Sequence, residues 1–152
     1  MTTKTIKSFG VTVTFDDNSK EILKAMENAL HRGLEAIGMK AEDYAKRDAK
    51  MPVDTGLARN SITHAVTGYP AAIQTYKADR PRKGEEKPRV GTYDGNMEGE
   101  KDEAVVIGSG IKYFTFIENG TKKMKARHVL RRAATDHGNE YKKLMKESFE
   151  NA

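Results

Sequence analysis

The chain has 152 residues, 37% hydrophobic and 32% charged, which suits one domain, residues 1–152, with a lean core that leaves part of the chain outside it or buried only by a partner. Lysine and arginine outnumber aspartate and glutamate by 27 to 22, a mild excess compatible with phosphate-bearing partners. Cysteine is absent, which excludes disulfides, thiolate zinc sites and a cysteine nucleophile.

The first predicted element is a strand at residues 5–15, in which Val11, Val13 and Phe15 alternate with threonines. Residues 16–19 carry side-chain oxygens that suit a helix N-cap, and Glu21 places a carboxylate in the predicted first turn, where the helix dipole favours it. The strand is therefore expected to lead directly into a helix.

A long amphipathic helix is predicted from there to about Ala49, because apolar residues recur at three- and four-residue steps between Ile22 and Ala45. Gly33 and Gly38 each weaken a helix by about 1 kcal/mol relative to alanine. Their presence indicates that the helix bends there or that another backbone packs close to it.

Pro52 stops this helix, and residues 52–56 have the composition of a turn in which Asp54 or Thr55 can cap a short following helix or turn through Arg59. A strand is predicted at residues 61–68.

The segment 75–103 then carries seven basic and eight acidic residues and almost no aliphatic ones, so it cannot form a core. Its charges segregate, with six basic residues in 77–89 and five acidic residues in 94–103. This pattern favours a charged arm or hairpin that becomes ordered against neighbouring subunits, with a turn at residues 94–95, and disorder is the alternative.

The last third of the chain is predicted to contain a short strand at residues 104–107 and a final helix that starts near residue 126 and can break at the glycine at 138. Between them, Tyr113, Phe116 and Ile117 suit a helical turn capped by Gly120, whereas the alternation of Phe114 with Phe116 equally suits a strand. The expected fold class is α+β, an antiparallel sheet packed by a long N-terminal helix and a C-terminal helix, with a charged arm or hairpin insert.

No pattern indicates catalysis, a cofactor or a metal site. No nucleophile elbow surrounds any serine, and the four histidines lack the spacings of zinc ligands. Residues 94–99 match the start of a calcium loop, but Val105 stands where the bidentate glutamate belongs. The Gly-Ser-Gly sequence at 108–110 lacks the rest of a phosphate-binding motif. We therefore expect no enzyme and no cofactor.

Residues 122–132 hold six basic residues and no acidic one. A solvated face is the ordinary interpretation of such a cluster, and a surface near nucleic-acid backbone or an acidic protein rim is the functional one. Because neither a recognition helix nor a set of stacking aromatic residues accompanies the cluster, sequence-specific binding is not expected.

Two segments carry motifs in a characteristic order. Residues 51–62 read Met-Pro-Val-Asp-Thr-Gly-Leu-Ala-Arg-Asn-Ser-Ile, residues 113–121 read Tyr-Phe-Thr-Phe-Ile-Glu-Asn-Gly-Thr, and residues 126–133 read Ala-Arg-His-Val-Leu-Arg-Arg-Ala. They resemble the Pro-Val-Asp-Thr-Gly-x-Leu-x-x-Ser-Ile, Tyr-Ala-x-x-Val-Glu-x-Gly-Thr and Ala-Arg-Pro-Phe-Leu-Arg-Pro-Ala patterns of the bacteriophage neck or tail-completion proteins, a head–tail joining family of the gene product ten-like type. The departures are a leucine one place early in the first motif, Phe114 in place of a small residue, and His128 and Arg132 where the family often has prolines.

The resemblance implies a structural virion protein that is made in the host cytoplasm. It implies a homo-oligomeric ring, expected to be a hexamer, between head-closure or portal-side proteins and the tail terminator or tube, with DNA in the lumen but no sequence readout and no membrane contact. It also implies an ion pair of Glu118 with Arg127 or Arg59. The motif residues with implied structural roles are Pro52, Asp54, Thr55, Gly56, Tyr113, Glu118, Gly120 and Thr121.

Basic residues of the insert and of the region after residue 121 are expected to contact neighbouring subunits or proteins: Lys77, Arg80, Arg82, Lys83, Arg89, Lys122, Lys123, Lys125, Arg127, Arg131 and Arg132. The alternative function is that of a small basic protein that binds nucleic acid without sequence preference through residues 77–89 and 122–132. No apolar run approaches the length of a membrane span or of a signal peptide, in keeping with both alternatives.

Overall fold

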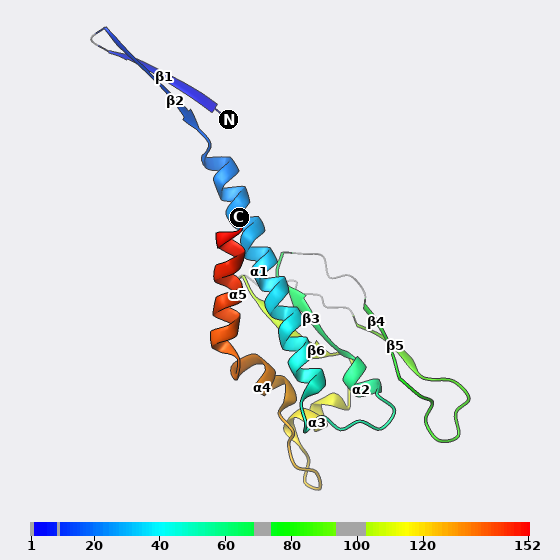
Figure 1. Ribbon diagram of the computed structural model, residues 1–152. Helices are drawn as coiled ribbons and strands as arrows, with labels where there is room; N and C mark the ends of the chain where they lie inside the picture. The colour runs from blue at the N-terminus through cyan, green and yellow to red at the C-terminus, as the bar shows by residue number, and fades with distance from the viewer. Residues whose placement is uncertain (1, 9, 69–73, 94–102) are drawn as a thin grey trace.

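The helix α1 (Ser19–Arg47) is the axis along which the other elements lie in the computed structural model (Figure 1), which describes residues 2–8, 10–68, 74–93 and 103–152. The predicted amphipathic helix is confirmed, because one stripe of it buries Ala29, Leu34, Ala41 and Ala45. No side chain of the residue before the helix caps it; instead, the Asp17 carboxylate accepts a hydrogen bond from the Ser19 amide at 3.2 Å.

The strands of the described residues form separate two-stranded antiparallel sheets. β3 (Ile62–Val66) pairs with β6 (Val105–Ser109), with Ile62 opposite Ser109, and this pair packs against α1. β4 (Gln74–Lys77) pairs with β5 (Val90–Tyr93), so the part of the charged insert up to Tyr93 belongs to a hairpin. The predicted α+β class and the predicted strands near 61–68 and 104–107 are confirmed, whereas the turn predicted at residues 94–95 lies outside the described residues.

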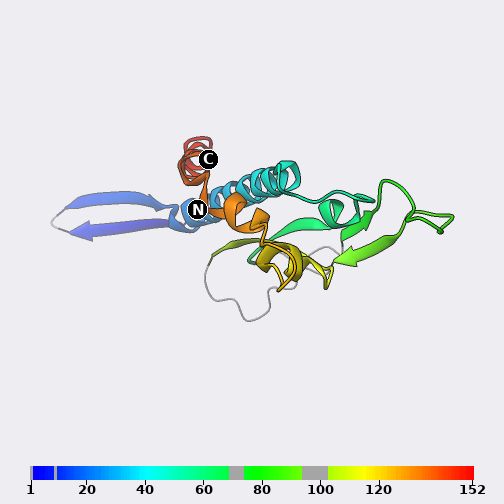
Figure 2. The ribbon, with the colours of Figure 1, turned by 90° about the horizontal axis from the view of Figure 1, so that it is seen from below.

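The single strand predicted at residues 5–15 is wrong, because this segment is a hairpin. β1 (Thr2–Ser8) and β2 (Val11–Asp17) pair antiparallel, with Thr5 opposite Thr14. The chain reverses at Gly10, which has a φ of 74°, a value that glycine adopts without steric cost. Seen from below, this hairpin projects from one end of α1, and the β4–β5 hairpin lies at the other end of the molecule (Figure 2).

The remaining helices are α2 (Leu57–Asn60), α3 (Phe114–Asn119), α4 (Val129–Thr135) and α5 (Gly138–Glu150). The open choice at residues 113–120 is resolved as a helix that ends at Gly120. The predicted final helix is two helices with a break before Gly138, and its first turn begins at Val129 instead of near residue 126. α5 packs along α1, and α4 contacts both α1 and β6.

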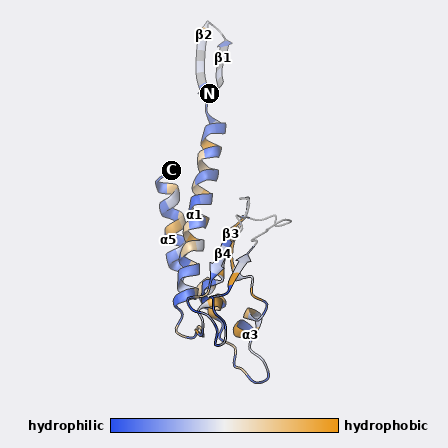
Figure 3. Ribbon diagram, turned by 90° about the vertical axis from the view of Figure 1, so that its right-hand side faces the viewer, coloured by the Kyte–Doolittle hydropathy of each residue, from blue (hydrophilic) through white to orange (hydrophobic). Residues whose placement is uncertain are grey.

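The core is small and lies between the C-terminal half of α1, β3, α3 and α4. Its buried residues are Ala45, Met51, Ile62, Phe114, Ile117, Val129 and Ala133. Figure 3 shows the apolar colour of β3 and α3 at this end of the molecule. The lean composition is therefore matched by a core that occupies only one part of an elongated chain.

Candidate functional site

The motif turn at residues 52–56 connects α1 to α2 and holds the start of the loop that joins β4 to β5. The carbonyl of Thr55 accepts hydrogen bonds from the amides of Asp79 at 2.8 Å and of Arg80 at 3.4 Å. The Nε of Arg80 also donates to the carbonyl of Asp54 at 2.9 Å. These bonds to main-chain oxygens fix the insert against the turn, which explains why a turn motif and a charged insert act as one structural unit.

Gly56 is required at its position for two reasons. Its φ of 82° lies in the left-handed region, and an added Cβ would collide with the carboxylate of Asp79. That carboxylate cannot move freely, since Arg59 forms an ion pair with it and Asn60 donates to it at 2.9 Å. Arg59 therefore pairs with Asp79, and the prediction that it pairs with Glu118 is wrong.

A cavity of about 410 Å³ lies beside the motif turn, and we call it the motif cavity. The two motif segments meet in its wall, because Pro52, Asp54, Thr55 and Gly56 line it together with Tyr113. Three arginines of the insert, Arg80, Arg82 and Arg89, complete the wall. The structure thus brings together residues of both predicted sets, motif and basic, that lie far apart in the sequence.

The three arginines of the motif cavity differ in their pairing. Arg89 donates through Nε to Glu85 at 2.8 Å, and this hydrogen bond lowers the pKa of the Glu85 carboxyl. Arg80 lies 3.6 Å from the Asp54 carboxylate, and Arg82 has no ion-pair partner among the described residues. Because guanidinium groups bind carboxylates, the three arginines of the wall suit recognition of a carboxylate group.

Glu118 caps the helix α4. Its carboxylate accepts hydrogen bonds from the backbone amides of Leu130 at 3.0 Å and Arg131 at 2.9 Å. A carboxylate at this place satisfies amides that have no partner within the helix and is favoured by the helix dipole. The predicted ion pair of Glu118 with Arg127 is therefore replaced by a helix cap, in which a side chain of the second motif segment binds backbone amides of the third.

Gly120 and Thr121 shape the loop between α3 and α4. Gly120 has a φ of 76°, and an added Cβ would lie 2.6 Å from the backbone nitrogen of Ala126. The amide of Thr121 donates to the carbonyl of Met124 at 2.8 Å, and its hydroxyl accepts from the amide of Met124 at 3.0 Å. The loop is thereby closed on itself and presents its three lysines outward.

The entry to α4 is built differently from the family pattern. His128 has a φ of 50°, which proline cannot adopt because its ring holds φ near −65°. Arg132, at the second proline position, donates from Nε and Nη2 to the two carboxylate oxygens of Asp48, each at 2.8 Å. Burial alone would raise the pKa of Asp48, but the hydrogen bonds from Arg132 lower it. This pair ties α4 to the end of α1.

His64, to which the sequence assigned no role, lies on β3 with its ring against α1. His64 Nδ1 is 2.7 Å from Glu42 Oε2, and His64 Nε2 is 2.8 Å from Glu35 Oε1. The hydrogen bond to Glu42 raises the pKa of His64; burial opposes this, and Glu35 adds to it. Only a protonated ring donates from both nitrogens, so the geometry favours the imidazolium. Gly38 makes room for it, since an added Cβ would lie 2.5 Å from His64 Cδ2.

The basic residues predicted to contact neighbours divide into paired and available ones. Arg80, Arg89 and Arg132 are engaged within the chain. Arg127 is half-buried. Seven others are exposed and form no ion pair with any residue that the structure describes: Lys77, Arg82, Lys83, Lys122, Lys123, Lys125 and Arg131.

The chain matches no protein-family model, no curated protein and no solved structure. Within the described ranges, no group of three or more histidine, aspartate or glutamate side chains is arranged to hold a metal ion, and no helix is long and apolar enough to cross a bilayer.

Proposed function

We propose that this chain is a structural subunit of a bacteriophage head–tail connector. Its copies form a ring between head-closure or portal-side proteins and the tail terminator or tube, and DNA passes through the lumen. The proposal rests on the motif resemblance and on one observation of the structure, the amount of surface that a single chain leaves exposed.

The chain exposes 10,980 Å². A compact monomer of 16.9 kDa is expected to expose about 7,700 Å², from the 0.73-power scaling of surface with mass. The difference of about 3,300 Å² exceeds the roughly 1,600 Å² that two interfaces of standard size cover on one subunit. Such an excess suits a subunit that has a neighbour on each side.

Exposed apolar side chains support the same proposal. Val90 is 60% exposed on the β4–β5 hairpin, and Phe116 is 55% exposed on α3. Leu23 is 59% exposed at the far end of α1. Large apolar side chains at both ends of an elongated subunit are expected when more than one partner covers it.

The roles of the motif residues also favour architecture over chemistry. Gly56 and Gly120 admit close contacts of the chain, and Glu118 caps a helix. Each of these roles serves to hold a loop in one shape. A structural protein needs such fixed loops at its contacts with adjoining layers.

Native mass spectrometry of the full chain, combined with its detection in purified phage particles, tests the proposal. We expect one closed oligomer with a single subunit number and labelling at the neck of the particle in electron micrographs. A chain that stays monomeric at every concentration and is missing from particles would refute the connector proposal.

A second candidate function is sequence-nonspecific binding of nucleic acid, and the α3–α4 loop favours it. Lys122, Lys123 and Lys125 are exposed on this closed loop and form no ion pair with a described residue. Tight duplex binding by a stable monomer, with an affinity that falls steeply with salt, would favour this function. Replacing the three lysines with alanine should then abolish binding, whereas the matched change of three α5 lysines, at 142, 143 and 146, should not.

A further inference from the structure

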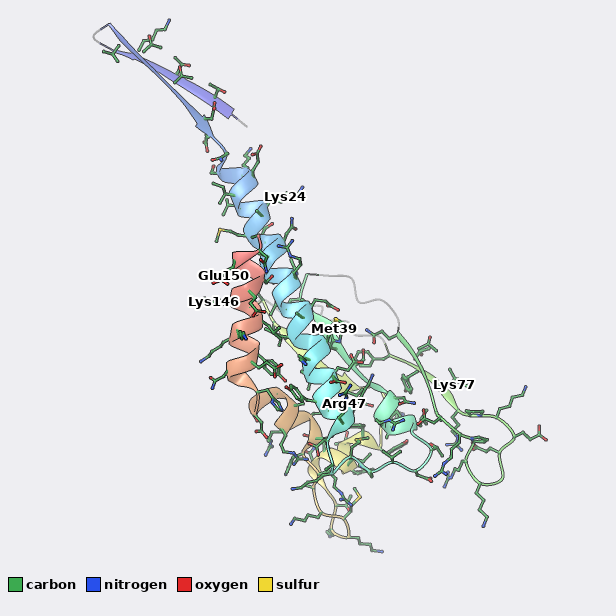
Figure 4. All side chains as sticks on the ribbon, in the orientation of Figure 1. Lys24, Met39, Arg47, Lys77, Lys146 and Glu150 are labelled. Atoms are coloured by element: carbon green, nitrogen blue, oxygen red, sulfur yellow. The ribbon has the colours of Figure 1, made fainter. Side chains whose placement is uncertain are left out.

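The N-terminal arm, residues 2–28, stands apart from the body of the molecule. It consists of the hairpin β1–β2 and the first turns of α1, and every residue from 19 to 28 is exposed. Ala29 is the first buried residue of α1, and its carbonyl accepts a hydrogen bond from the Ser148 hydroxyl of α5. Figure 4 shows Lys24 beyond Glu150, the last residue of α5.

An isolated two-stranded hairpin is marginally stable in water, and a helix that is exposed on all sides gains no packing energy. The arm nevertheless carries an apolar stripe, because Ile22, Leu23 and Met26 lie at three- and four-residue spacing on α1. Their exposed fractions are 52%, 59% and 50%. The stripe therefore indicates a surface that a partner covers.

The body of the chain offers a receiving surface. A cavity of about 520 Å³ lies between α1, β6 and α4 and is lined mainly by apolar residues, among them Ile37, Val106, Ile107 and Leu130. Val106 is 46% exposed at this cavity. The volume falls in the range of pockets that enclose a ligand of several side chains, which is about 300–1,000 Å³.

The stripe cannot reach this cavity within one chain. Leu23 and Ile37 belong to the same continuous helix and are about 21 Å apart along its axis at 1.5 Å per residue. The two surfaces are therefore available to each other only in separate copies. Contact between different patches of two identical chains is a head-to-tail arrangement, which forms a ring when the rotation between successive copies closes.

Charge also matches across such a contact. Glu27 lies on the arm next to the stripe, and Arg131 lies in the wall of the cavity. Neither has an ion-pair partner among the residues that the structure describes. Glu27 and Arg131 have opposite charges, and the carboxylate of the same wall, Glu118, already accepts hydrogen bonds from two backbone amides, so the Glu27–Arg131 pair favours this contact.

We infer that the N-terminal arm docks on a second copy of this chain, with Ile22, Leu23 and Met26 seated in the cavity between α1, β6 and α4 of that copy. This inference rests on the proposed ring and specifies which surfaces form its subunit contact. The excess surface of about 3,300 Å² is large enough for the two contacts that each copy would make.

Site-specific crosslinking tests the contact, because the chain has no cysteine of its own. In the double variant Leu23→Cys with Val106→Cys, a short bismaleimide should join chains into a ladder of covalent oligomers. The matched control pairs Leu23→Cys with Val53→Cys, which is 51% exposed and outside the cavity wall, and should give no ladder.

Equal ladders from both pairs, or no ladder while the wild type sediments as an oligomer, would overturn the docking inference and leave the connector proposal standing. A ladder limited to two chains in a protein that sediments as a dimer would retain the docking contact and refute the ring. A wild-type chain that sediments only as a monomer would overturn both.

A second measurement keeps the inference independent of crosslinking geometry. Leu23→Glu should weaken self-association about tenfold or more, because a buried leucine would be replaced by a charge. Met39→Glu is the matched control, since Met39 is 60% exposed on the same helix but lies outside both the arm and this cavity (Figure 4). Equal dissociation constants for the two variants would contradict the docking of the arm.

Discussion

Gly38→Ala is expected to destabilise the protein, although alanine is the better helix former. Gly38 lies inside α1, where helix propensity alone favours alanine by about 1 kcal/mol. In the structure, however, an added Cβ would lie 2.5 Å from His64 Cδ2 and 2.9 Å from a methyl group of Val105. Either α1 must move away from β3, or the His64 ring must leave the position in which it bonds Glu35 and Glu42.

The gain in helix propensity and the steric cost of the added Cβ have opposite signs, and their sizes decide whether the variant is less stable. Overpacking of a core contact costs about 1–3 kcal/mol. If the His64 ring moves instead, loss of one hydrogen bond between His64 and a carboxylate costs about 1.5–3 kcal/mol. After subtraction of the gain of about 1 kcal/mol from helix propensity, we expect either response to lower the free energy of unfolding by about 1 kcal/mol.

Urea unfolding at one fixed protein concentration measures this change, since self-association makes apparent stability depend on concentration. Two glycine variants serve as controls. Gly33→Ala meets the flexible side chain of Met145 and should cost less, and Gly138→Ala meets no atom within 4 Å and should be neutral or stabilising. If Gly38→Ala is as stable as Gly138→Ala, the packing of His64 against α1 is not as described.

Three further outcomes are expected. Because the pKa of His64 is raised on folding, its stabilisation is complete below its unfolded pKa of about 6.5 and is lost as pH rises through the folded value. The difference in unfolding free energy between wild type and His64→Gln should therefore shrink as pH rises above about 6.5, and a constant difference would contradict this. Glu118→Gln should lower the unfolding free energy by about 1 kcal/mol in thermal denaturation, because an amide accepts from the α4 amides more weakly than a carboxylate; a hydrolase activity lost in this variant would instead mark Glu118 as catalytic. Gly56→Ala should lower the unfolding free energy by more than Gly84→Ala, which shares a positive φ but meets no atom within 4 Å, and equal losses would show that the Asp79 contact contributes nothing.

The turns and caps of this protein could be predicted in part because their signals are local. Gly120 was expected to end a helical turn and does so, and Pro52 follows the end of α1. The hairpin at the start of the chain was missed, although Gly10 between two alternating segments was a readable turn signal. The interruption before Gly138 was foreseen as a possibility, but the positions of both resulting helices follow from their packing on α1.

The candidate site was predictable as a set of residues but not as an arrangement. Both motif segments were recognised, yet their meeting at one cavity with arginines of the insert depends on the fold. The predicted partner of Glu118 was wrong, because spacing along the sequence cannot show whether a carboxylate pairs with an arginine or caps the following helix through its backbone amides. Glu35 and Glu42, seven residues apart on one helix face, hinted at a shared partner, but only the strand β3 supplies His64.

By itself, the sequence determined the amphipathic helix, the α+β class, the lean core and the charged insert, because periodicity and composition act between residues close along the chain. The tertiary structure alone decided which surfaces remain uncovered: the arm that extends past α5, the cavity beside β6 and the lysines of the α3–α4 loop, which form no ion pair with a residue that the structure describes. Exposure is a property of how rigid elements are placed against one another, so no local pattern in the chain encodes it.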